Sequence, residues 1–427
     1  DHARKIGSGI TPTGGAASYL DAGIPLLRSQ NVHFDGLRLD DVVYIAEDTH
    51  EEMRGTKLRG RDVLLNITGA SIGRCTFVPA GFGEGNVNQH VCIIRPAAKL
   101  NYKFLTYCLS APWGQDQVFS SFTGASRQGL GQRDLGGIQV PLPPPSEQQR
   151  IAAYLDASCA AIDAAVAAKR RQLETLDALR KSIIQRTITN GLDSAVPRKP
   201  TDSLYLSAVP THWAVRSLKQ CADILNGYAF DSTTYVEDGV PIIRIGDVAA
   251  TIDWTKVKRV PPELLSELAR FIIQRDDILI ALTGATIGKS ALYCDDTDAL
   301  LNQRVAVLRA SRMNAEFLNY IIQTHVFTEP IDLLCSGGAQ DNIGKGEVGG
   351  IKIPVPPLGE QESIVGFLNE KTERLFNLSG VLETQIATLT AYRKSLIHEC
   401  VTGQRRITEA DLAWVGRGKS LSSRPSR

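Results

Sequence analysis

The stretch GIPLLR at residues 23–28 returns as GVPIIR at residues 239–244, and this repetition decides how the chain is divided. A longer stretch repeats next, because DVLLNITGASIG at residues 62–73 matches DILIALTGATIG at residues 277–288. The offset between matching residues drifts from about 216 to about 213 along the chain, as short loop deletions between two copies would produce. The 427 residues are therefore predicted to be one unit of about 213 residues written twice.

Each copy begins with a compact domain of mixed structure. Short apolar runs typical of buried strands alternate with turns rich in Gly, Asn and Asp, as at residues 62–67 and 91–94 and again at 277–282 and 305–308. Shorter helical patterns follow at residues 102–109 and 315–322. The predicted fold class is α+β, with the two related domains at residues 1–140 and 211–353.

A proline block and a long helix follow each domain. The blocks PLPPPSEQ (141–148) and PVPPLGEQ (354–361) fix an extended backbone, and Ser146 and Gly359 are the expected N-caps. Apolar residues then recur every seven positions, at Leu368, Leu375, Leu382, Leu389 and Leu396, and at Leu155, Ile162, Leu176 and Ile183, with Lys169 interrupting the row in the first copy.

This spacing predicts two helices, residues 141–191 and 354–403, that pair as an antiparallel coiled coil. Each would hold roughly 40 helical residues, or about 60 Å. The alternative is that each helix lies on the surface of its own domain. Glycines 191 and 403 are the expected C-caps. Residues 192–210 are expected to be a linker, and 404–427 a partly disordered tail.

Composition excludes several classes of protein. The 47 basic and 46 acidic residues leave a net charge of +1, too little for a protein that coats nucleic acid by charge alone, so a nucleic-acid footprint must be a local patch. The 8 cysteines form no CxxC pair, so neither a disulfide framework nor a structural zinc is expected. No run approaches about 18 apolar residues, so no membrane span is expected.

Recognisable catalytic motifs are also missing from the sequence. GATIGKS at residues 284–290 suggests a phosphate-binding loop, but its glycines are too close together, and residues 74–75 of the other copy lack both the lysine and the hydroxyl. There is no zinc-binding His-Glu helix, no nucleophile elbow and no Asn/Asp-Pro-Pro-aromatic methylation motif. The repeated Asp62 and Asp277 are expected to cap or shape turns. We expect no catalytic residue and no metal site.

Polar residues around the repeated loops are the candidates for contacts with base edges, because Arg, Asn and Gln can each make two hydrogen bonds to guanine or adenine. An ordinary surface or fold-supporting role is the alternative for each of them. The candidates are Arg28, Ser71, Arg74, Asn88, Gln89, Arg127 and Gln128 in the first copy, and Arg244, Thr286, Lys289, Asn302, Gln303, Arg304, Gln340, Asn342 and Lys345 in the second.

The duplication, the repeated Thr-Gly-Ala-Ser/Thr-Ile-Gly turn, the proline–Glu-Gln junction and the heptad helices together resemble the DNA-specificity (S) subunit of type I restriction–modification systems. The resemblance covers essentially the whole length. The segment PTHW at residues 210–213 is typical of the start of the family's target-recognition domains. No such segment precedes residue 1, so the first domain is expected to be N-terminally truncated.

The resemblance implies a non-catalytic subunit. Each target-recognition domain would read one half of a bipartite sequence in double-stranded DNA, and the helices would set the spacer and dock two methyltransferase (modification) subunits. Restriction/translocase subunits would join them. S-adenosylmethionine, ATP and Mg²⁺ would be bound by those partners, with no cofactor in this chain. A cytoplasmic location without membrane contact is expected.

Two other functions fit less well. One is a scaffold or tethering protein whose paired helices hold partners together without reading sequence. The other is a DNA-modifying enzyme, against which the missing methylation and nuclease motifs argue.

Overall fold

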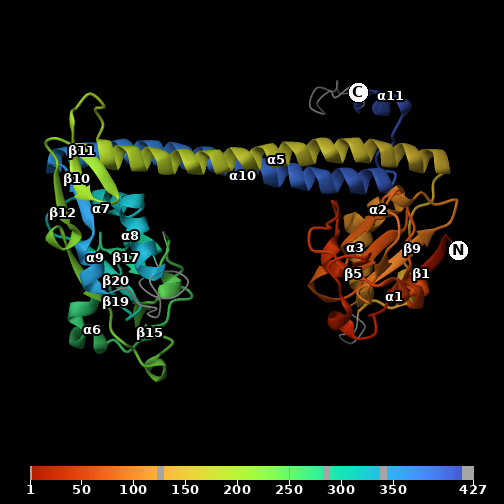
Figure 1. Ribbon diagram of the computed structural model, residues 1–427, viewed down its shortest axis with the longest axis horizontal. Helices are drawn as coiled ribbons and strands as arrows, with labels where there is room; N and C mark the ends of the chain where they lie inside the picture. Colours follow the sequence, from red (N-terminus) through yellow and green to blue (C-terminus); the bar gives the residue numbers. More distant parts are fainter. Residues whose placement is uncertain (1, 123–128, 250, 282–287, 337–343, 416–427) are drawn as a thin grey trace. The chain divides into compact units, whose positions relative to one another are not determined.

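The computed structural model describes residues 2–122, 129–249, 251–281, 288–336 and 344–415. The chain divides into two compact units, each with one globular domain and one half of each long helix. Unit 1 comprises residues 1–170 and 383–427, and unit 2 comprises residues 171–382. Figure 1 shows both units, coloured along the sequence from red at the N-terminus to blue at the C-terminus, with some of the helices and strands labelled.

The domain of unit 1 is built on two small sheets. The larger is antiparallel, in the order β1 (Ala3–Ser8), β9 (Val91–Pro96), β6 (Val63–Asn66) and β7 (Cys75–Phe77). The second has the order β5 (Val43–Ile45), β2 (Ile24–Leu27) and β8 (Asn86–Val87), and a hairpin joins β3 (Val32–His33) to β4 (Gly36–Leu37). The helices of this domain are α1 (Glu47–Glu52), α2 (Tyr102–Ser110), α3 (Pro112–Phe122) and α4 (Gln132–Gly136).

Unit 2 repeats this plan, with one more strand in its second sheet. Its larger sheet has the order β13 (Ala222–Asn226), β20 (Val305–Ala310), β17 (Ile278–Ala281) and β18 (Ser290–Leu292). Its second sheet has the order β15 (Arg259–Val260), β14 (Val240–Ile243), β19 (Ala299–Leu301) and β16 (Ile272–Ile273). The corresponding helices are α6 (Leu264–Glu267), α7 (Ala315–Ile321), α8 (His325–Ser336) and α9 (Lys345–Gly350). The predicted α+β fold and its duplication are confirmed.

The two long helices are α5 (Pro145–Asn190) and α10 (Leu358–Val401). Each begins two residues earlier than the expected N-caps imply, so Ser146 and Gly359 lie in the first turn rather than at the N-cap. Proline's fixed φ suits the first position of a helix, which explains why α5 already starts at Pro145. The expected C-caps are confirmed, because Gly191 and Gly403 follow the helices with φ of 77° and 79°.

Each unit contains an antiparallel pair of helix segments. In unit 1 the first half of α5 packs with the second half of α10, and Leu155, Ile162 and Leu396 are buried in one cluster. In unit 2 the second half of α5 packs with the first half of α10, through Ile188 and Leu368. Lys169, which interrupts the heptad row, donates a 2.5 Å hydrogen bond to Gln385 Oε1. The alternative of helices lying separately on their own domains is therefore wrong.

The segments flanking the long helices carry structure of their own. Residues 192–210, expected to be a linker, contain a hairpin of β10 (Arg198–Ser203) and β11 (Leu206–Pro210), and β12 (Ala214–Ser217) then pairs with β21 (Lys352–Val355). Within the tail, α11 (Glu409–Val415) follows the buried Ile407. The remainder of the tail, 416–427, lies outside the described residues.

The repeated proline–Glu-Gln junction attaches each domain to its helix. Gln148, fully buried in unit 1, accepts a 2.7 Å hydrogen bond from Asn101 N and donates to the carbonyls of Lys99 and Pro143. Gln361 does the same in unit 2, accepting from Asn314 N at 2.8 Å and donating to Pro356 O. A glutamine suits this buried position because its side-chain amide can both accept and donate hydrogen bonds.

By length and composition alone, α5 could cross a membrane. Its most apolar window of 18 residues has a mean hydropathy of 1.5, and 44% of that window is buried within the structure. A core helix of a folded domain meets the same test.

Candidate nucleic-acid interface

Four loops of unit 1 meet where β6 ends and β8 turns into β9. Asn66, the last residue of β6, donates through Nδ2 to Ser29 O at 2.7 Å and to Ser71 Oγ at 3.1 Å. Ile67 N donates to His90 O, and Leu130 N donates to Ile67 O. We call the loops around residues 28–31, 66–74, 88–90 and 129–130 the loop cluster of unit 1.

A chain of side-chain hydrogen bonds crosses this loop cluster. Thr11 Oγ1 donates to Gln89 Oε1 at 2.5 Å, Gln89 Nε2 lies 3.1 Å from His90 Nε2, and His90 Nδ1 lies 2.5 Å from Thr68 Oγ1. Because an amide nitrogen can only donate, His90 Nε2 accepts and the ring proton sits on Nδ1. Gln89 is exposed, yet these contacts hold its amide in one orientation. An amide fixed in this way can present its remaining donor and acceptor to a base edge.

Asn88 supports the turn that carries Gln89. It is 6% exposed, and its Oδ1 accepts a 3.2 Å hydrogen bond from His90 N, while its own N–H donates to Leu27 O. Asn302 repeats this in unit 2, at 9% exposure, with Oδ1 3.5 Å from Arg304 N. Both asparagines were base-contact candidates, and both lie where they shape the backbone of the turn.

The other candidates of unit 1 differ in how firmly intramolecular contacts hold their side chains. The Arg28 guanidinium donates to Asp41 O at 2.7 Å and lies 5.9 Å from the Tyr19 ring centroid. Ser71 Oγ accepts from Asn66. Arg74 is half-buried, and its side chain has no hydrogen bond or ion pair among the described residues. Arg127 and Gln128 lie outside the described residues. Of the described candidate cations in unit 1, Arg74 is therefore the one whose side chain is not held by a hydrogen bond or an ion pair within the described residues.

The equivalent turn of unit 2, at residues 302–304, keeps the backbone contact and changes the side chains. Asn302 N donates to Ile243 O, as Asn88 N does to Leu27 O in unit 1. Arg304 stands in place of His90, and both Gln303 and Arg304 are exposed. Gln303 N donates to Tyr228 O, and the Tyr228 ring, 40% exposed, lies 5.0 Å from that of Phe230. Unit 2 therefore offers a cation and an aromatic face where unit 1 offers a Thr–Gln–His chain.

The remaining candidates of unit 2 do not all join this cluster. Arg244 is held by an ion pair with Asp247 at 3.1 Å, and Lys289 is exposed beside Ala281. Lys345 instead borders a shallow pocket along β13 with Asp223 and Arg309, away from the turn at Gln303. Thr286, Gln340 and Asn342 lie outside the described residues.

The predicted turn at residues 68–73 is confirmed in unit 1, with Gly69 and Gly73 at φ of 71° and 84°. A Cβ on Gly73 would lie 2.5 Å from Gln115 Oε1, so the Gln115 side chain packs against this glycine. In unit 2, Gly288 has a φ of 81°, and residues 283–287 of this turn lie outside the described residues.

Two glycines that the sequence reading missed let the first strand approach the turn. A Cβ on Gly9 would lie 2.0 Å from Val87 O, and one on Gly227 would lie 2.1 Å from Asn302 O. Real side chains cannot come so close, so only glycine fits at either place. Their recurrence two residues before Thr11 and before Ala229 was the available signal.

Comparison with known proteins agrees with the duplicated architecture. A family model described as the type I restriction modification DNA specificity domain matches residues 36–175 and again residues 210–386. The type I restriction enzyme MjaVIII specificity subunit of Methanocaldococcus jannaschii is 27% identical over 277 residues, covering 63% of this chain and 63% of that protein. The EcoBI specificity subunit of Escherichia coli is 22% identical over 316 residues, covering 70% and 64%. The chain thus matches just under two thirds of the length of these relatives.

Solved structures share the fold over nearly the full length. A chain from a study of complex assembly and conformational transition of the type I R-M system has a TM-score of 0.69 at 18% identity, covering 94% of this chain and 95% of that one. The HsdS subunit from Thermoanaerobacter tengcongensis has a TM-score of 0.52 at 16% identity, covering 95% of each chain. At these identities the likeness establishes the fold.

Proposed function

The chain belongs to the type I restriction modification DNA specificity family, and from that premise we propose that it is the sequence-reading subunit of such a complex. Each domain reads one half of a bipartite sequence in double-stranded DNA. The two long helices, to which both domains are attached, set the length of the unread spacer. The observation that carries this proposal is that the equivalent turns at residues 88–90 and 302–304 share a backbone contact and carry different side chains.

Different side chains on equivalent loops suit two different half-sites. A fixed amide such as that of Gln89 suits adenine, which offers a donor and an acceptor in the major groove. An exposed arginine such as Arg304 suits guanine, which offers two acceptors. The near-zero net charge of the chain fits a subunit that contacts bases through a local patch. Partner subunits would then supply part of the binding to DNA phosphates.

Gln89→Leu is expected to relax base preference within one half-site only. Losing a two-hydrogen-bond contact should reduce discrimination at the affected base pair by about 1–3 kcal/mol. Gln303→Leu should do the same within the other half-site. Binding of the assembled methyltransferase complex to a library with both half-sites randomised would report both preferences at once.

Each variant is the matched control for the other. Because both glutamines are exposed, neither change should lower the melting temperature of the chain. The proposal fails if the parent chain folds and assembles with its partner subunits and the complex protects no bipartite sequence. The assignment of Gln89 to base reading fails if its variant changes affinity equally for every sequence.

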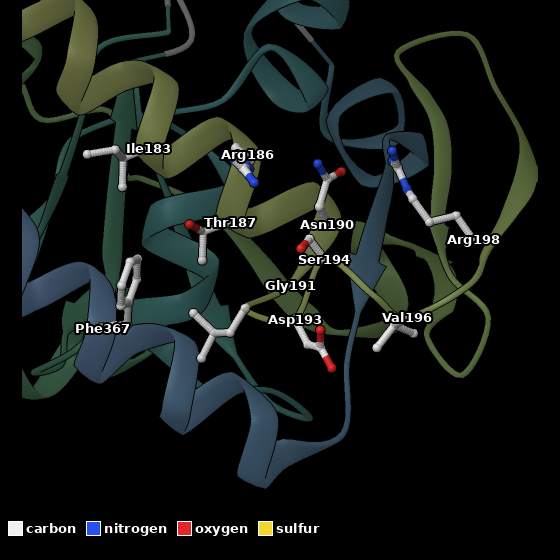
Figure 2. A pocket seen from close by; sticks show the side chains of 11 residues that line it. Ile183, Arg186, Thr187, Asn190, Gly191, Asp193, Ser194, Val196, Arg198 and Phe367 are labelled. Carbon is white, nitrogen blue, oxygen red and sulfur yellow. The ribbon is translucent and has the colours of Figure 1, made fainter.

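Partner subunits need a surface, and we propose the exposed apolar side chains of α10 in unit 2. Phe376 is 77% exposed, Val381 53% and Leu378 47%, which is unusual for a helix that also buries an apolar seam. Beside this helix, a groove of about 520 Å³ opens between Phe367 and the end of α5 at Asn190. Figure 2 shows Phe367 and Ile183 on one side of it and Asp193 and Arg198 on another. A methyltransferase subunit is the proposed occupant.

Phe376→Asp is expected to weaken assembly with the methyltransferase by at least about 10-fold, because a buried charge without a partner opposes association. Folding should be unaffected, since the ring is mostly exposed. Leu204→Asp is the matched control, as Leu204 is 84% exposed on the β10–β11 turn of the same unit. Analytical ultracentrifugation of mixed subunits would measure assembly. Equal affinity of the Phe376 variant and the parent would contradict this surface.

We propose that this chain supplies no chemistry of its own. The methyltransferase subunits would bind S-adenosylmethionine, and the restriction/translocase subunits would bind ATP and Mg²⁺. Incubating the isolated chain with DNA and S-adenosylmethionine should therefore give no methylation, and methylation by the chain alone would favour an enzyme. With DNA as its partner, a cytoplasmic location follows, and the free thiols of Cys75, Cys92 and Cys108 suit it.

A further inference from the structure

Three potential metal ligands meet in unit 1, away from the loop cluster. Glu47 and His50 lie on α1, and Glu84 lies two residues before β8. One ligand atom of each residue lies within 4.8 Å of those of the other two. We propose that these three side chains bind a divalent cation of the zinc class.

The imidazole of His50 is set up as a ligand by its neighbours. Asn86 donates through Nδ2 to Met53 O at 3.0 Å and to Thr56 Oγ1 at 2.8 Å, which turns its Oδ1 toward His50 Nδ1. The Nδ1 atom therefore carries the ring proton, and Nε2 has a free lone pair. Metal-binding histidines commonly have their other ring nitrogen fixed in this way by a donated hydrogen bond.

The Nε2 atom of His50 has no other use in the described structure. His50 is 1% exposed, and Nε2 is buried without a hydrogen-bond partner among the described residues. A buried polar atom left in this state destabilises the fold. A cation held by Nε2 and the two glutamates would satisfy it.

The second copy shows that the fold does not require these polar residues. Asn86 pairs with Leu26 across β8 and β2, and the equivalent pair in unit 2 is Leu300 with Ile242. Counting from the matching β5 and β15 pairings places Leu265 at the position of His50 and Phe271 at that of Thr56. These three residues of unit 2 belong to one apolar cluster. A buried His–Asn–Thr set retained only in unit 1 therefore calls for a ligand.

The carboxylates complete a site suited to zinc. Glu47 lies three residues before His50, so both project from the same face of α1. Both glutamates are exposed and can adjust to the roughly 2.0–2.2 Å bonds and tetrahedral geometry of zinc, with water as the fourth ligand. An imidazole nitrogen favours zinc over Mg²⁺, which prefers oxygen ligands alone. The ion would tie α1 to the segment that leads through β8 to the turn of Gln89.

This proposal departs from the expectation of no metal site. That expectation rested on the absence of paired cysteines and of a zinc-binding His-Glu helix, whereas here the sequence signal is Glu-x-x-His at residues 47–50. The third ligand, Glu84, is brought close by strand pairing between distant segments, including that of β2 with β8. Sequence spacing alone does not reveal it.

The test is zinc binding to the full chain after removal of metals with a chelator. Titration against a chromophoric zinc indicator should give one site per chain. Glu47→Gln and Glu84→Gln should each weaken that site by about 10- to 100-fold, at least the loss seen when an outer partner of a ligand is removed. Asp48→Asn, next to Glu47, and Asp298→Asn, the counterpart of Glu84, are matched controls that should leave the affinity unchanged.

A triple variant removes the site without leaving a hole. His50→Leu with Thr56→Phe and Asn86→Leu copies the apolar set of unit 2 and should fold yet bind no zinc at this site. Cobalt replacing zinc should give a four-coordinate spectrum without thiolate bands. The proposal is overturned if the chain binds no zinc, if the glutamate variants bind it as tightly as the parent, or if thiolate bands show that cysteines hold it.

Discussion

Asp62→Ala should lower the free energy of unfolding of unit 1 by about 3–5 kcal/mol, because it removes one partner of a buried ion pair. Asp62 is 1% exposed, and both of its oxygens accept hydrogen bonds of 2.7 Å from Nε and Nη2 of Arg95, which is 17% exposed. Without the carboxylate, the guanidinium would stay largely buried and uncompensated. Urea denaturation followed by circular dichroism would measure the loss.

The same carboxylate also holds a turn. Asp62 Oδ2 accepts a 2.8 Å hydrogen bond from Arg59 N, and Arg61 between them has a φ of 74°. Unit 2 repeats every part of this arrangement, with Asp277 bonded to Arg309 and to Gln274 N, and with Asp276 at a φ of 68°. Asp277→Ala should therefore weaken unit 2 by a similar amount.

Hydrogen exchange would separate the two effects. Asp62→Ala should reduce protection in β6 and β9 and leave β17 and β20 unchanged, whereas Asp277→Ala should do the reverse. Asp35→Ala is the matched control, because its ion pair with Arg38 joins side chains that are 62% and 57% exposed, and its loss should cost at most about 1 kcal/mol. If Asp62→Ala lowers the free energy of unfolding by less than about 1 kcal/mol, the Arg95 guanidinium becomes hydrated in the variant at little energetic cost.

The turn role predicted for Asp62 and Asp277 is thus confirmed, but their arginine partners were not predicted. The repeat contained the signal, since Arg95 and Arg309 recur at nearly the same offset as the aspartates. Strand register joins them, and register depends on pairing between distant segments. Heptad spacing, by contrast, can be recognised within a single segment of sequence. It therefore predicted both long helices and their pairing.

The loop cluster could be predicted in outline only. Recurrence singled out the turn at Asn88 and Gln89, and the structure places that turn at the meeting point of the loops. Recurrence could not show that Asn88 is a buried support and Gln89 an exposed contact, because both residues are polar and both recur at the same offset. Thr11 and His90 were missed since neither recurs in the second copy, where Ala229 and Arg304 take their places.

Replacing the first domain with the second should change the target to one with two like half-sites. The chimera joins residues 214–355 directly to Pro143, so the second domain brings its own β12–β21 pair. Binding to the parent target should fall by at least about 10³-fold, toward non-specific affinity, because one half-site loses its reader. Selection from a library with both half-sites randomised, using the assembled complex, would identify the new target.

The attachment contacts show that the second domain can dock on the first helix. Gln148 would accept from Asn314 N in place of Asn101 N, as Gln361 already does. One contact that does not transfer is the ion pair of Lys103 with Asp156, because Glu316 takes the position of Lys103. Two facing carboxylates would repel each other, whereas in unit 2 Glu316 accepts a 2.8 Å hydrogen bond from Asn369.

The chimera therefore needs Asp156→Asn, which recreates the Asn369 contact, and the unsubstituted chimera is its matched control. The substituted chimera should melt near the parent temperature and select two like half-sites, and the control should melt lower while selecting the same sequence. Protection of the parent target by a folded chimera would place sequence reading outside the exchanged domain. Because the contact at residue 156 lies at the junction with the helix, it should affect stability and leave base preference to the loops.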